Sequence, residues 1–163
     1  MKKRIIACFI VFILTVTAFS NTVLAAGTPT ITVGSITAEK GDTVTLDVSI
    51  SNNPGINTFV LGFDYDTTRL NLSDVTLSSS LGGQYVYSKK AVWLNNSDTT
   101  YNGKILTLTF HVLDNADAGD ASVAVTYNAG DISNYNEEDV SFNLVAGKVT
   151  IKEESGYSPR LNF

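Results

Sequence analysis

Polar and apolar residues alternate along most of this chain. The pattern is clearest in Thr43–Ile50, Lys104–Leu113 and Ser122–Tyr127, where the two residue types exchange at nearly every step. A period of two residues is typical of a β-strand with one buried face and one exposed face. We extend the interpretation to six further segments bounded by turn residues, namely Thr30–Val33, Asn57–Tyr65, Leu70–Thr76, Gln84–Ser88, Ala91–Asn95 and Val140–Ile151, the last with a bend at Ala146-Gly147.

Clusters rich in Gly, Asn and Asp separate these segments, as in Asn52-Asn53-Pro54-Gly55 and Leu81-Gly82-Gly83. Such residues supply the positive φ angles and the local hydrogen bonds that turns require. No segment between the strands has the period of an amphipathic helix. Short strands at spacings of about 8–14 residues without helical connections indicate two packed sheets. The sequence therefore predicts an all-β fold, a nine-stranded antiparallel β-sandwich.

The first residues have the pattern of a secretory leader. A basic head, Met1–Arg4, precedes an apolar run, Ile5–Phe19, which is shorter than the roughly 20 residues that span a bilayer as a helix. Small residues follow at Val23-Leu24-Ala25, as at a signal-peptide cleavage site. We expect a secreted, extracellular protein with no membrane attachment after signal removal, divided into a signal peptide (1–25), a sandwich domain (26–152) and a short C-terminal tail (153–163).

Removal of the leader changes the charge and the cysteine content. Three of the 11 Lys and Arg residues lie in it, so the remainder carries 8 of them against 16 Asp and Glu residues, a net charge of −8. This charge argues against nucleic acid and anionic membrane surfaces, which bind basic patches. The only cysteine, Cys8, also lies in the leader. Disulfides, thiol catalysis and cysteine-ligated metals are therefore excluded from the secreted domain.

Candidate catalytic and metal-binding residues are few. His111 is the only histidine and shares a strand face with Thr107 and Thr109, and no nucleophile motif accompanies it. Most carboxylates lie in turns, where Asp is selected for its local hydrogen bonds. Three of them, Asp114, Asp117 and Asp120, are hard oxygen ligands in one loop, but their spacing does not match an EF-hand. We therefore expect no enzyme activity, no cofactor and no metal site.

Aromatic and acidic residues are the candidates for binding. Tyr85 and Tyr87 are two residues apart and therefore share a strand face. Tyrosine and tryptophan are enriched at interfaces, because they cover much area and tolerate water. We predict that Tyr85 and Tyr87 are exposed and that Val86 and Leu94 point inward, and we leave the side of Trp93 open. The run Glu137-Glu138-Asp139 is either a solvated loop or an acidic rim that steers a basic partner.

Several motifs, in order along the chain, resemble those of cohesin domains. They are Glu39-Lys40-Gly41-Asp42-Thr43-Val44, Gly55-Ile56, Phe63-Asp64-Tyr65-Asp66 with Leu70, Gly103-Lys104-Ile105-Leu106 with Phe110, and Val145-Ala146-Gly147-Lys148-Val149. Cohesins are nine-stranded jelly-roll sandwiches without catalytic activity. They bind dockerin modules and so fix polysaccharide-degrading enzymes in cellulosomes, and the calcium of the complex belongs to the dockerin. The resemblance implies a dockerin as the partner of this chain.

The resemblance also implies which residues bind. The cohesin surface is one flat sheet face, formed by the third, fifth, sixth and eighth strands. Thr58 and Val60 stand where the best-known cohesins place Asn and Asp, which implies a dockerin of a different type. The residues expected at the interface, from the resemblance and from the aromatic pattern together, are Thr58, Val60, Gly62, Tyr85, Tyr87, Trp93, Asn95, Thr126, Asn128 and Glu137.

Two other functions remain open. A carbohydrate-binding module would stack polysaccharide on a row of aromatic side chains, for which Tyr85, Tyr87 and Trp93 are the candidates. A structural domain of a surface assembly would associate with itself. We expect a monomer with a heterologous partner.

Overall fold

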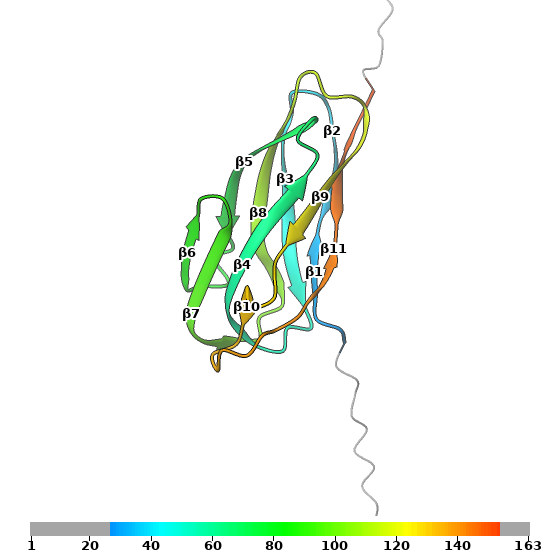
Figure 1. Ribbon diagram of the computed structural model, residues 1–163. Coiled ribbons are helices and arrows are strands. Elements are labelled where there is room, and N and C mark those ends of the chain that lie inside the picture. The colour runs from blue at the N-terminus through cyan, green and yellow to red at the C-terminus, as the bar shows by residue number, and fades with distance from the viewer. Residues whose placement is uncertain (1–26, 154–163) are drawn as a thin grey trace, which may run out of the picture.

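The computed structural model describes residues 27–153, which form two β-sheets packed face to face (Figure 1). The first sheet has the strand order β11-β1-β3-β8-β5, and the second has the order β2-β12-β9-β4-β7-β6, with β10 paired to β4. The strands are β1 (Thr30–Val33), β2 (Ser35–Ala38), β3 (Thr43–Ser51), β4 (Ile56–Tyr65), β5 (Leu70–Leu77), β6 (Gln84–Tyr87), β7 (Ala91–Thr99), β8 (Gly103–Val112), β9 (Gly119–Thr126), β10 (Ile132–Ser133), β11 (Asn143–Val145) and β12 (Gly147–Ile151).

The core lies between the two sheets. In β3, buried apolar residues alternate with polar ones that are exposed, apart from the half-buried Ser49, as the sequence predicted. The largest fully buried side chains are Trp93, Phe59 and Phe110. Removal of this apolar area from water is the main driving force for folding, at about 25 cal/mol per Å². Successive strands cross repeatedly between the sheets, as in a jelly roll. The predicted all-β sandwich is confirmed.

The number and direction of the strands differ from the prediction. The described residues form twelve strands, not nine, because β2 and β10 were not expected and Val140–Ile151 divides into β11 and β12. Strand β2, Ser-Ile-Thr-Ala, alternates over only four residues, and three of them are exposed, so this pattern was too short to indicate a strand. Two strand pairs, β1 with β11 and β2 with β12, are parallel, whereas the prediction was purely antiparallel.

Two glycines allow the chain to change sheets at one point. Gly34 separates β1 from β2, and its amide donates to the Asp47 carbonyl oxygen at 2.8 Å. Gly147 begins β12, and a Cβ atom there would collide with the Gly34 carbonyl oxygen and would lie 2.7 Å from that of Val33. The bend predicted at Ala146-Gly147 is therefore confirmed as a crossing between sheets that only glycine fits.

The predicted signal peptide, residues 1–25, lies outside the described residues, as does the tail beyond residue 153. Within residues 27–153, no helix is long and apolar enough to cross a membrane.

Candidate partner-binding face

Four apolar side chains lie together on the outer face of the second sheet. Val86, Val92 and Val60 are directly opposite one another on β6, β7 and β4, and Leu94 follows Val92 in the neighbouring row. Val86 is 65 % exposed, Leu94 47 % and Val92 40 %, while Val60 is half-buried. We name these four residues the apolar patch. Neighbouring exposed apolar side chains, unlike isolated ones, mark an interaction surface.

The predicted orientation of β6 and β7 is wrong. Tyr85 pairs with Trp93, and Tyr87 pairs with Ala91, on the inner face of the sheet. Trp93 is fully buried, and both tyrosines are half-buried and packed against the core. These three aromatic side chains therefore do not form the exposed platform that the sequence suggested. Val86 and Leu94, which were expected inside, take the exposed positions instead.

Trp93 explains this orientation. Its ring stacks on Phe59, with 5.2 Å between ring centroids, and its Nε1 donates to the Gly82 carbonyl oxygen at 2.7 Å. A Cβ atom at Gly83 would lie 2.6 Å from Nε1, so the glycine makes room for the indole. Aromatic side chains bury about 150–250 Å² each, more than Val or Leu, so the sheet gains more by burying the aromatic set.

Burial also changes the chemistry of Tyr85. Its hydroxyl donates to the Val75 carbonyl oxygen at 2.8 Å, at the edge where β5 and β6 meet. Desolvation, with the Asp74 charge as a smaller cause, raises the pKa of Tyr85 to about 12. Desolvation also raises the pKa of Tyr87. Both side chains therefore act as neutral core residues.

We predict that stability falls as the pH rises from about 10, the pKa of tyrosine in an unfolded chain, toward 12, the pKa of Tyr85 in the fold. In this window the unfolded state loses the proton and the folded state keeps it, so unfolding becomes more favourable. Urea denaturation between pH 9 and pH 12 measures the loss. The Tyr85→Phe variant should show a smaller slope with pH. An identical slope in both proteins would contradict the assignment.

The predicted positions on β4 and β9 lie on the outer face. Thr58 and Val60 alternate with the buried Phe59, and the Thr58 hydroxyl donates to the Trp93 carbonyl oxygen at 2.9 Å. Gly62 lies opposite Thr126, and a Cβ atom at Gly62 would lie 2.7 Å from Thr126 Oγ1. Gly62 is therefore covered by the exposed threonine. The hydroxyl of Thr58 is already used within the fold.

The remaining predicted residues lie in irregular segments around this face. Between Ile56 and Thr58 the register with β7 shifts from Thr99 to Leu94, so residues 95–98 bulge out of the sheet. Asn95 begins this bulge, and its side-chain Nδ2 donates to the Ser97 carbonyl oxygen. Asn128 follows β9 and donates its backbone and side-chain N–H groups to Asp131. Glu137 is exposed and has a positive φ of 64°.

Glu137 belongs to a well-ordered loop, residues 133–139. Ser133 and Asp139 form a β-bridge that closes it. Asn134 Oδ1 accepts the amides of Asn136 and Glu138, and its Nδ2 donates to Glu138 Oε2 at 2.7 Å. The Tyr135 amide donates to Asp98 Oδ1, also at 2.7 Å, which ties the loop to the bulge of β7. The loop is therefore held in one position beside the apolar patch.

Basic residues lie at the opposite end of β7. Lys89 and Lys90 form the turn between β6 and β7, and Lys90 Nζ lies 3.9 Å from Asp131 Oδ2. The hydrogen bond from the Asn128 amide lowers the pKa of Asp131, with the Asn128 side chain and Lys90 as further causes. Asp131 is thus negatively charged and adjoins the apolar patch, since its carbonyl oxygen accepts the Val60 amide at 2.7 Å.

The structure does not bring the candidate catalytic and metal-binding residues together. His111 lies on the first sheet between Thr43 and Asn71, on the same outer face as Thr107 and Thr109. Asp120 binds the side chains of Lys148 and Thr150, both at 2.7 Å. Among residues 27–153, no three His, Cys, Asp or Glu side chains gather as a metal site would require. Asp114, Asp117 and Asp120 therefore form no such cluster.

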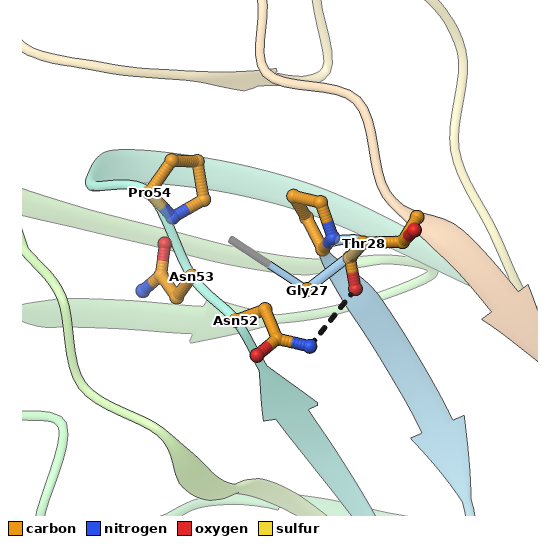
Figure 2. Close-up of a pocket in the computed structure, with 6 residues that line it drawn as sticks. Gly27, Thr28, Asn52, Asn53 and Pro54 are labelled. Carbon is orange, nitrogen blue, oxygen red and sulfur yellow. Dashed lines mark hydrogen bonds between the residues drawn. The ribbon is translucent and has the colours of Figure 1, made fainter. Parts of the chain in front are cut away.

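One hollow lies between the start of β1 and the β3–β4 loop (Figure 2). It measures about 530 Å³ and is lined by Gly27, Thr28, Pro29, Asn52, Asn53 and Pro54. Asn52 Nδ2 donates across it to the Thr28 carbonyl oxygen at 3.1 Å. These six residues include no carboxylate, imidazole or amine side chain, so they offer no acid–base chemistry.

Solved structures with the same fold include several cohesins. A chain of a complex between CaDoc0917 and CaCohA2 is 21% identical, with a TM-score of 0.68 over 77% of this chain and 100% of that chain. A chain of the Clostridium thermocellum Coh-OlpA–Doc918 complex is 19% identical, with a TM-score of 0.64 over 77% and 100%. The non-cellulosomal cohesin of Archaeoglobus fulgidus is 18% identical, with a TM-score of 0.66 over 79% and 94%.

A comparison with curated proteins found no match. The family model described as Cohesin domain matches residues 29–151, which include every strand of both sheets. Cohesin domains are non-catalytic binding modules, in agreement with a site made of apolar and loop residues rather than of acids and bases. From the extent of this match and from the shared fold, we conclude that the chain belongs to the cohesin family.

Proposed function

We propose that this protein is a secreted cohesin module that binds a dockerin on the outer face of its second sheet. The observation that carries the proposal is the apolar patch, which a domain without a partner would leave in contact with water. The patch lies on β4, β6 and β7. A solvated loop and a basic turn border it, and an apolar centre with a polar rim is the usual plan of a protein interface.

The chemistry of the patch suggests the type of dockerin. Val60 offers no hydrogen-bonding group, and the Thr58 hydroxyl already donates to the Trp93 carbonyl oxygen. Dockerin contacts at the centre of this face are therefore aliphatic. An amphipathic helix that lays its apolar side on a matching surface is a common mode of recognition. We infer a dockerin whose contact helix carries aliphatic side chains at its centre.

In this proposal the protein acts by docking alone. Residues 1–25 direct export, and residues 26–152 present the binding face to a dockerin attached to a polysaccharide-degrading enzyme. The net charge of −8 after removal of the leader accelerates association with a basic partner, and added salt slows it, because salt screens the attraction. No cofactor is needed.

Titration of a panel of dockerins against the secreted protein tests the proposal. We expect at least one dockerin with an aliphatic contact helix to bind, and dockerins with polar contact residues to bind more weakly. Isothermal titration calorimetry gives the affinities. Failure of every dockerin in the panel to bind would contradict the proposal.

A pull-down on insoluble cellulose, done together with the dockerin titration, tests carbohydrate binding. Tyr85, Tyr87 and Trp93 point toward the core, so they do not form a row on which sugars could stack. We therefore expect the protein to remain in the supernatant. Retention on cellulose together with no dockerin binding would favour the carbohydrate-binding alternative. Size-exclusion chromatography of the free protein tests self-association, for which we expect the elution volume of a monomer.

A further inference from the structure

We propose that Tyr135 is a further partner-binding residue of this chain and that Asp98 is the residue that positions it. This inference deepens the proposed function and rests on it. The partner is defined by its chemistry: a helix whose stripe of aliphatic side chains extends past the apolar patch, so that one further apolar side chain packs on the Tyr135 ring.

Tyr135 differs from the other aromatic residues of the domain in its exposure. Its exposed fraction is 62 %, whereas every other aromatic side chain within residues 27–153 is buried or half-buried. Tyrosine is enriched among the residues that dominate binding energies, because its rigid ring covers much area and loses little conformational entropy. A loop also exposes a tyrosine when no core lies beneath it, so position and order decide between these two interpretations.

The position of Tyr135 joins it to the apolar patch. Ser133 of β10 is opposite Thr58 of β4, and Thr58 is opposite Leu94 of β7. Ser133 and Leu94 are therefore two strand spacings apart, about 10 Å. Tyr135 follows Ser133 by two residues, and its amide donates to Asp98 of the β7 bulge. The exposed ring thus continues the apolar surface of the patch on the other side of β4.

The other exposed apolar side chains fall into two groups. Within the part of the chain that the structure describes, three large ones belong to the patch itself, and three lie on β2, at the opposite edge of the same sheet, or on β11 of the first sheet. The first group is Val86, Val92 and Leu94, and the second is Ile36, Leu144 and Val145. Tyr135 lies with the first group, which makes it a neighbour of the proposed interface.

The backbone of Tyr135 is ordered before any partner binds. Asn134 Oδ1 accepts the amides of Asn136 and Glu138, which sets the shape of the loop itself. Asp98 Oδ1 accepts the Tyr135 amide at 2.7 Å, which ties this loop to the sheet. A residue that is already in position loses less freedom on binding, so the affinity is higher. Asp98 therefore supports binding through Tyr135 and does not have to touch the partner.

Two substitutions of Tyr135 test the role of the ring, with the dockerin that binds the wild type most tightly in the panel. Tyr135→Ala removes the ring and should weaken binding about tenfold or more, as truncation of a dominant contact residue does. Tyr135→Phe keeps the ring and should stay within about twofold of the wild type, as should the control Ile36→Ala, since surface changes outside a contact have small effects. Isothermal titration calorimetry gives the affinities.

Two substitutions of Asp98 separate the hydrogen bond from the charge. Asp98→Ala removes the acceptor of the Tyr135 amide and should weaken binding about fivefold, the value of one hydrogen bond. Asp98→Asn keeps an oxygen at the same place without the charge and should restore most of the affinity. Hydrogen exchange of the Tyr135 amide should be faster in Asp98→Ala than in Asp98→Asn or the wild type. Equal weakening by both substitutions would overturn the positioning role.

The double variant, Asp98→Ala with Tyr135→Ala, tests whether Asp98 acts through Tyr135. We expect it to bind about as weakly as Tyr135→Ala alone, because residues that act as one unit are not additive. If the two losses multiply instead, Asp98 contacts the partner independently, and the positioning role is wrong.

The outcomes also distinguish this inference from the proposed function. Wild-type affinity in Tyr135→Ala, measured with a dockerin that does bind the protein, would overturn the inference and leave the proposed function intact. If no dockerin binds at all, the proposed function fails, and the inference fails with it.

Discussion

Replacement of Leu94 by aspartate is expected to weaken dockerin binding at least 30-fold, about 2 kcal/mol. Leu94 belongs to the apolar patch, beside Val92, and a carboxylate that is buried there by a partner without a counterpart loses its hydration. The side chain is 47 % exposed in the free protein, so the substitution should change stability little. Isothermal titration calorimetry measures the affinity, and a thermal melt confirms that the variant is folded.

The matched control for this variant is Val145→Asp. Val145 is 43 % exposed and lies on β11 of the first sheet, away from the proposed interface. It receives the same new charge, so any general effect of added negative charge appears in both variants. We expect the affinity of Val145→Asp to stay within about twofold of the wild type. Equal weakening by the two substitutions would show that the apolar patch is not the contact surface.

The Gly147→Ala variant is expected to lose at least about 3 kcal/mol of unfolding free energy. The added methyl group meets the carbonyl oxygens of Gly34 and Val33, which are backbone atoms and cannot move aside as a side chain would. The β1–β2 connection at Gly34 and the β11–β12 connection at Gly147 would have to move apart to make room for the methyl group. Urea denaturation, followed by the fluorescence of the single tryptophan, Trp93, measures the loss.

Gly130→Ala separates steric conflict from the general cost of replacing glycine. Gly130 has a φ of 83°, and no atom lies within 4 Å of a Cβ built there. The expected loss is about 1–2 kcal/mol, the cost of a left-handed conformation for a residue with a side chain. If Gly147→Ala costs no more than Gly130→Ala, the close packing at the crossing has no special role in stability.

Alternation predicted the strands well, because most of them have one buried face and one exposed face. In β3 the two sets of residues differ clearly in polarity, so sequence alone identifies both the strand and its buried side. The short strand β2 lies at the edge of the sheet with Ser35, Ile36 and Thr37 exposed, and its alternation covers only four residues, too few to distinguish it from a loop.

The alternating pattern could not predict which residues of β6 and β7 face the core. Both sets of residues are apolar there, with Tyr85 and Tyr87 on one face and Val86 on the other. A period of two establishes that the sets point in opposite directions, but not which one is inside. The decision depends on Phe59, which is 34 residues from Trp93 in the sequence and stacks on it only in the folded sheet.

The position of the acidic loop was also beyond the reach of the sequence. Its own pattern, Glu137-Glu138-Asp139, left a solvated loop and a binding rim equally plausible. The contact that places it beside the apolar patch joins Tyr135 to Asp98, which are 37 residues apart. Tyr135 lies in a loop and Asp98 in the bulged part of β7, and for neither do period and propensity predict the position in space.

The arrangement of β1 and β12 has a mechanical consequence. The described chain enters β1 and leaves β12 at opposite ends of the sandwich (Figure 1), and β1 is held between β3, which pairs with all four of its residues, and β11, which pairs with Thr30, Ile31 and Thr32. Tension applied at these two points would draw β1 and β12 in opposite directions along their own axes. The hydrogen bonds of β1 would then resist together rather than one after another, which gives the domain resistance to a force applied along this direction.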